Sequence, residues 1–134
     1  MTQDLDLVVK LSPEHVRSLF AALSGIGYRP RVSVTAEGFG DPEQRTRWIA
    51  EKGMMVLNFH SDAHRETPVD VLVSEPFDFD REYRRALVVE VAAGVPLRVL
   101  ALPALARLKR EAGRPQDLAD LAELRLLPGE IADE

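Results

Sequence analysis

The chain is predicted to form an α+β domain in which a mixed β-sheet is flanked by helices. Stretches with the two-residue period of strands and stretches with helical periodicity follow one another without a strict β-α-β alternation, which disfavours a doubly wound parallel sheet. Gly25 and Gly27 do not form a glycine-rich phosphate loop. The length of 134 residues and the ordinary hydrophobic content of 46% predict one domain over 1–127, with a frayed tail over 128–134.

Periodicity, helix caps and chain breakers set the expected elements. Ser12 followed by Pro13 is typical of a helix start. Asp41 and Gln44 predict a second helix start with a capping box. In chain order we expect a strand over 4–9, a helix over 13–24, an extended segment over 28–34, a helix over 42–52, strands over 54–59 and 69–74, a partly helical connector over 77–85, a hairpin of 86–91 and 97–100, and helices over 103–110 and 115–126.

The strands expected over 54–59 and 69–74 differ in their predicted burial. Residues 54–59 form a nearly continuous apolar run, so this strand is predicted to be buried on both faces. Residues 69–74 alternate instead, which puts the three valines on one face of the strand and Asp70 on the other.

Composition and charge exclude several classes of function. The net charge of -5 argues against general nucleic-acid binding, which needs a concentrated basic face. The absence of cysteine excludes disulfides and thiolate metal sites. No apolar run reaches the about 18 residues of a membrane helix, and the acidic start 1–6 lacks the basic region of a signal peptide. We therefore expect a cytoplasmic protein without membrane association.

The first expected strand carries a pair of acids. Asp4 and Asp6 are two residues apart, so both carboxylates leave the same face, with Cα atoms about 7 Å apart. Two acids on an otherwise apolar strand repel each other and are costly to bury. A divalent cation offsets that cost, because magnesium favours carboxylate oxygens. The alternative interpretation of this pair is a solvated strand end.

A third acid, Asp70, lies inside a run of valines and leucine, where an acid is expected only if its face is open or metal-bound. If its strand neighbours the first strand, the carboxylates of Asp4, Asp6 and Asp70 converge. Three such carboxylates could hold the ions of a metal-assisted phosphoryl transfer. The alternative is an edge-strand aspartate that faces water.

Two other polar clusters are weaker candidates. His60, Asp62 and His64 could ligate zinc, but their spacing matches no closed zinc site and predicts an exposed loop instead. The arginines of segment 81–85 are balanced by neighbouring acids, Glu82 among them, so a solvated helix face is expected there.

The order of these motifs resembles the polymerase-beta-like nucleotidyltransferase superfamily. The resemblance comes from the DLD of 4–6, a following helix, a long excursion and the VDVL of 69–72. The chain resembles small bacterial members of this superfamily, which include abortive-infection-type toxin nucleotidyltransferases. Segment 108–121, LKREAGRPQDLADL, resembles the lysine, arginine and aspartate helix pair that is common in that group.

The resemblance implies a nucleotidyltransferase-like fold with a site for Mg²⁺ or Mn²⁺ and a nucleoside triphosphate. It assigns Asp4, Asp6 and Asp70 as metal ligands and catalytic residues. It also assigns Lys109 as a cofactor-binding residue that faces the nucleotide phosphates.

One part of the family pattern has no counterpart in this sequence. Family enzymes carry a glycine-serine turn shortly before the paired acids, whereas only Met1, Thr2 and Gln3 precede Asp4 here. The expected fold therefore lacks the usual N-terminal helix and glycine-serine turn. The two interpretations are a start assigned too far downstream and a non-catalytic relative.

The function expected is thus a nucleotidyltransferase-like protein that binds a divalent metal and a nucleotide. The alternative is a non-catalytic interaction or toxin-antitoxin-like module of the same fold. Loss of the N-terminal helix is expected to expose apolar surface and a sheet edge, which a second copy or a protein partner would cover.

Overall fold

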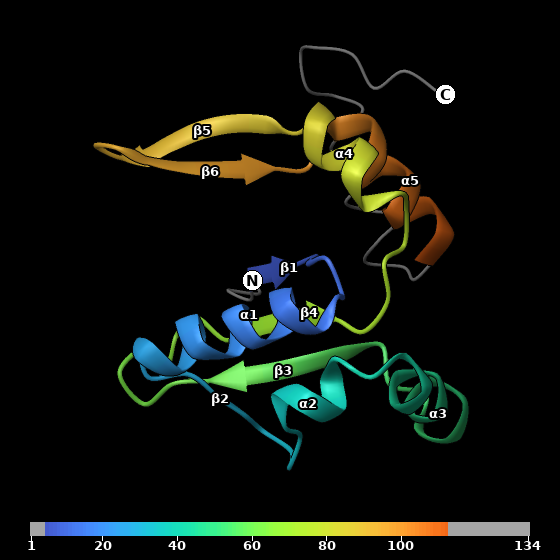
Figure 1. The fold of residues 1–134 in the computed structure, drawn as a ribbon. Coiled ribbons are helices and arrows are strands. Elements are labelled where there is room, and N and C mark those ends of the chain that lie inside the picture. Colours follow the sequence, from blue (N-terminus) through green and yellow to red (C-terminus); the bar gives the residue numbers. More distant parts are fainter. Residues whose placement is uncertain (1–4, 113–134) are drawn as a thin grey trace. The chain divides into compact units, whose positions relative to one another are not determined.

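A computed structural model describes residues 5–112, and the chain divides into two compact units, Met1–Glu75 and Pro76–Glu134, each of which is described by itself (Figure 1). The described residues form a mixed sheet, a hairpin and five helices, which confirms the α+β class with a mixed sheet. The elements are β1 (Leu5–Leu7), α1 (Pro13–Gly25), β2 (Arg29–Pro30), α2 (Ala36–Phe39), α3 (Pro42–Lys52), β3 (Val56–His60), β4 (Val69–Leu72), α4 (Phe79–Arg85), β5 (Leu87–Ala92), β6 (Val95–Val99) and α5 (Leu102–Ala112).

The first unit holds a four-stranded sheet in the order β1-β4-β3-β2. β1 runs parallel to β4, while β3 is antiparallel to both β4 and β2. The N–H of Leu5 donates to the Pro68 carbonyl at 3.0 Å at the start of the parallel pair. The strand at the N-terminal end of the chain and the strand that carries Asp70 are therefore neighbours.

Helices α1 and α3 start at the predicted residues, but one of the predicted capping hydrogen bonds is not formed. The Ser12 side chain caps α1 by accepting from the His15 N–H at 3.3 Å. Asp41 caps α3 by accepting from the Glu43 N–H at 3.0 Å. The predicted capping box is wrong, because Gln44 accepts from the Arg47 guanidinium at 2.7 Å instead of reaching back to the cap.

The segment between α1 and α3 differs from the expected extended strand. Only Arg29–Pro30 pairs as β2, and the four-residue helix α2 follows it. The Thr35 hydroxyl caps α2 by accepting from the Gly38 N–H at 3.1 Å. Arg45 of α3 then donates to the Phe39 carbonyl at 2.5 Å. Burial lowers the pKa of the Arg45 guanidinium, and the nearby carboxylates of Glu75 and Asp41 partly offset this shift.

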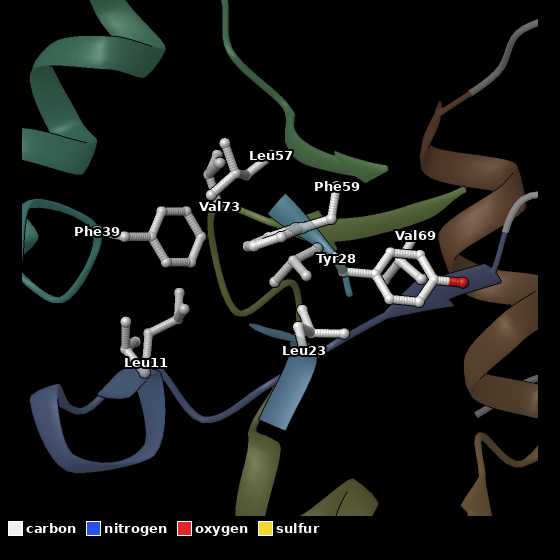
Figure 2. Close-up of a cluster of buried hydrophobic side chains, with 10 residues drawn as sticks. Leu11, Leu23, Tyr28, Phe39, Leu57, Phe59, Val69 and Val73 are labelled. Carbon is white, nitrogen blue, oxygen red and sulfur yellow. The ribbon is translucent and has the colours of Figure 1, made fainter. Parts of the chain in front are cut away.

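One face of the sheet and helices α1 and α2 enclose the core of the first unit (Figure 2). The rings of Phe20 and Phe59 meet edge to face at 5.2 Å, and Phe39 is fully buried beside them. The valines of β4 share one face, as predicted from their alternation, and this face is buried in the core. The buried apolar residues of the cluster are Leu11, Val16, Leu23, Tyr28, Phe39, Leu57, Phe59, Val69, Val71 and Val73.

The prediction that residues 54–59 are buried on both faces is wrong. Leu57 and Phe59 are buried, whereas Val56 is exposed and Asn58 is half-buried, so β3 alternates like β4. Asn58 is the physical reason, since its amide has partners on the opposite face of the sheet. The face that carries Asn58 is thus polar.

The second unit contains the predicted hairpin and two helices. β5 and β6 pair around Gly94, whose φ of 74° suits glycine, and the Gly94 N–H donates to the Glu90 carboxylate at 2.7 Å. α5 begins at Leu102, one residue before the predicted start. Arg98 of β6 lies over the Tyr83 ring at 4.0 Å and donates to the Tyr83 carbonyl, which ties the hairpin to α4.

Three predictions fall outside the described residues: Asp4, the helix over 115–126 and the tail over 128–134. The arrangement of 1–127 as one domain stays a prediction. None of the helices between residues 5 and 112 is long and apolar enough to cross a membrane.

Candidate metal site

Asp6 and Asp70 are register partners on the parallel strands β1 and β4. Residues paired in register on neighbouring strands point to the same face of a sheet, and such strands lie about 4.8 Å apart. Asp6 is exposed and Asp70 is half-buried. The structure therefore brings together two of the three predicted metal ligands on one face.

That face is the one turned away from the core of the first unit. Val69 and Val71, on either side of Asp70, are buried in the core, so the Asp70 side chain leaves the strand on the opposite face. Both carboxylates thus avoid the apolar interior that would penalise their charge.

Asn58 extends the polar face from β4 to β3. It is the register partner of Asp70, and its side-chain amide donates to Asp70 Oδ1 at 2.6 Å. The other Asp70 oxygen, Oδ2, has no hydrogen-bond partner among residues 5–112. Asn58 therefore orients the carboxylate and leaves one of its oxygens available to a ligand.

Arg31 continues the row beyond Asn58. Its backbone N–H donates to the Asn58 carbonyl at 2.9 Å, and its side-chain Nε donates to the Asn58 side-chain oxygen. The side-chain NH₂ of Asn58 thus donates to the Asp70 carboxylate, while its side-chain oxygen accepts from the Arg31 guanidinium. Four residues on adjacent strands or their extensions thus form one row across the sheet, which we call the polar row: Asp6, Asp70, Asn58 and Arg31.

The donor set of the polar row fits a hard divalent cation. Carboxylate oxygens are the preferred protein ligands of Mg²⁺, which binds one or two of them and keeps waters for a substrate phosphate. Within residues 5–112 no group of three His, Cys, Asp or Glu side chains could hold a metal ion. The three-carboxylate site with Asp4 stays a prediction, because Asp4 lies outside the described residues.

Lys109, the predicted phosphate-facing residue, lies on α5 in the second unit and is half-buried. The two units are described separately, so its role toward the polar row stays a prediction.

The loop after β3 shows no metal centre in the described part of the chain. His64 stacks on the Tyr28 ring at a centroid distance of 5.7 Å, and Asp62 pairs with Arg29 at 3.7 Å with both side chains largely exposed. The Tyr28 hydroxyl donates to the Thr67 carbonyl at 2.7 Å, which holds the far end of the loop. These partners give the loop's polar residues structural roles.

The expectation of a solvated face over 81–85 is wrong for Glu82. Its side chain is only 4% exposed and accepts from the Arg107 guanidinium at 3.1 Å, with Arg85 at 3.9 Å. The reason is tertiary: α5 brings Arg107 to α4 from 25 residues away. Glu82 therefore joins the two helices of the second unit.

Sequence reasoning missed Asn58 and Arg31 as members of the site. The available signal was a polar residue that interrupts the apolar run 54–59. Its pairing with Asp70 depends on the strand register, which the sequence did not specify.

No family model matches this chain, and no curated protein is significantly similar to it.

Proposed function

We propose that this chain is a nucleotidyltransferase-like protein that binds Mg²⁺ or Mn²⁺ together with a nucleoside triphosphate on the polar row. The observation that carries the proposal is the register pairing of Asp6 with Asp70 on parallel strands. The motif order that resembles the polymerase-beta-like nucleotidyltransferases supports the same assignment, with Asp4 as a third ligand and Lys109 as a phosphate contact.

The electrostatics of the pair support a cation between the two acids. Two carboxylates on neighbouring strands repel each other, and a bound divalent ion reverses the sign of their interaction. The hydrogen bond from Asn58 fixes Asp70 Oδ1 and leaves Oδ2 for the ion. When bound, the ion would supply positive charge for the phosphate oxygens of the nucleotide.

Calorimetry of the full chain with MgCl₂ and each nucleoside triphosphate tests the proposal. We expect binding of a nucleotide that depends on Mg²⁺ and is lost in Asp70→Asn. Asp62→Asn is the matched control, because Asp62 is an exposed aspartate outside the polar row. Failure of the wild-type chain to bind Mg²⁺, or equal binding by Asp70→Asn, would contradict the proposal.

A second candidate function, a protein-interaction module, is favoured by the hairpin. Register places Leu87, Val89, Leu97 and Val99 on one of its faces, and these side chains are 41–56% exposed. The charged residues of the hairpin, Glu90 and Arg98, belong to the other face. An uncharged aliphatic patch of this kind is typical of a surface that a second copy or a protein partner covers.

A further inference from the structure

We infer that Arg31 is the phosphate-binding residue of the polar row and that Asn58 positions it relative to the metal-binding carboxylates. The inference rests on the proposed function and deepens it, because it adds an anion-binding end to the cation-binding end of the site. The observation behind it is that one amide, Asn58, bonds to both Asp70 and Arg31.

The row sets the distance between its two ends. Arg31 is held to β3 by its backbone bond to Asn58, and Asn58 is paired with Asp70 on β4. With about 4.8 Å between neighbouring strands, the Cα atoms of Arg31 and Asp70 are about 10 Å apart. A metal-bound polyphosphate is long enough to extend from the acids toward the guanidinium.

The Arg31 guanidinium is oriented and accessible, so it could bind an anion. Its Nε is bonded to Asn58, whereas its two terminal amino groups have no hydrogen-bond partner among residues 5–112. The side chain is exposed, so a ligand can reach it. A guanidinium oriented by one bond presents its remaining donors as a fork that matches two phosphate oxygens.

Arg29, two residues before Arg31 and within β2, does not offer the same arrangement. Its guanidinium pairs with Asp62 in the loop after β3. Arg31 is bonded to a neutral amide rather than to a carboxylate, so its positive charge is not directly compensated. This difference selects Arg31 as the anion ligand.

The probes for the test are MgCl₂ alone and inorganic tripolyphosphate with Mg²⁺, each titrated into the full chain by calorimetry. Arg31→Gln removes the charge and the fork but keeps a donor for Asn58. We expect it to leave the Mg²⁺ affinity within about twofold, while tripolyphosphate binds about 10–100-fold more weakly, as for loss of a charged hydrogen bond. Arg17→Gln is the control, since Arg17 is an exposed arginine of α1 on the core side of the sheet.

The outcomes separate this inference from the proposed function. Unchanged tripolyphosphate affinity in Arg31→Gln overturns the role of Arg31 and leaves the metal site intact. A parallel loss of Mg²⁺ affinity in Arg31→Gln also overturns it, because Arg31 would then act only through Asn58 on Asp70. Tripolyphosphate binding that needs Arg31 but not Mg²⁺ would support the anion site and contradict the metal site.

Discussion

Asp6 lies directly opposite Asp70 on a parallel strand, and both carboxylates point away from the hydrophobic core. Direct pairing of like charges on neighbouring strands is unfavourable unless water or a cation compensates for it. A divalent ion bound between these carboxylates, as we propose, would therefore improve stability as well as enable binding. Removing the charge of Asp6 or of Asp70 should therefore relieve the repulsion in the metal-free protein and at the same time weaken binding of the ion.

Asp70→Asn is expected to keep or raise stability in the absence of metal, by up to about 1 kcal/mol in the free energy of unfolding. The variant removes the repulsion from Asp6 and retains an oxygen that can accept from Asn58. Magnesium should raise the melting temperature of the wild type and not that of the variant. Thermal melts at neutral pH with and without MgCl₂ measure both effects. Strong destabilisation of the metal-free variant would instead make Asp70 a structural hydrogen-bonding residue.

Asn58→Leu is expected to lower the free energy of unfolding by about 1–2 kcal/mol, because it removes the bonds to Asp70 and to Arg31 from a half-buried position. Chemical denaturation measures this loss. Val56→Thr is the control on the same strand and face, where a change of at most about 0.5 kcal/mol is expected. Equal stability of Asn58→Leu and the wild type would show that the amide does not hold the polar row together.

Glu82→Gln is expected to destabilise the second unit by about 1–3 kcal/mol, because it leaves the charges of Arg107 and Arg85 without their buried partner. The decrease in the free energy of unfolding should be smaller than for a fully buried ion pair, since the side chains of Arg107 and Arg85 are 28% and 38% exposed. In Glu82→Gln, amide hydrogen exchange in α4 and α5 should become faster than in the wild type, and the increase should be larger there than in the first unit. Glu111→Gln, at an exposed position of α5, is the control. Unchanged exchange in α4 and α5 of Glu82→Gln would contradict the account.

Leu97→Lys is expected to weaken self-association or partner binding through the aliphatic face of the hairpin. Val88→Lys is the control, because Val88 is also exposed (59%, against 46% for Leu97) but belongs to the opposite, charged face. Light scattering over a range of concentrations measures the oligomeric state. A wild-type chain that stays monomeric at high concentration would contradict association through a second copy. A concentration dependence that Leu97→Lys leaves unchanged would exclude the aliphatic face as its cause.

Local patterns in the sequence predicted the local features well. Ser12 and Pro13 start α1, Gly94 forms the hairpin turn, and the alternating valines of β4 face the core. Each of these features depends on a side chain and its immediate neighbours, so a linear sequence contains the necessary information.

Features that depend on tertiary pairing could not be predicted in the same way. Asn58 and Arg31 join the polar row only because β3 lies between β4 and β2, and nothing in the run 54–59 indicates that strand order. The local sequence predicts a solvated face for Glu82, because its partner Arg107 lies 25 residues away in the chain. In both cases the partner of the polar residue lies on another element, and the residue's own type does not identify that partner.

Paramagnetic broadening by Mn²⁺ in the NMR spectrum of the full chain tests the metal site most directly. At substoichiometric Mn²⁺, we expect the amide resonances of β1 and β4 around Asp6 and Asp70 to broaden first, and Asp70→Asn to abolish this selectivity. Selective broadening around His60, Asp62 and His64, or broadening that Asp70→Asn leaves unchanged, would contradict a metal site on the polar row.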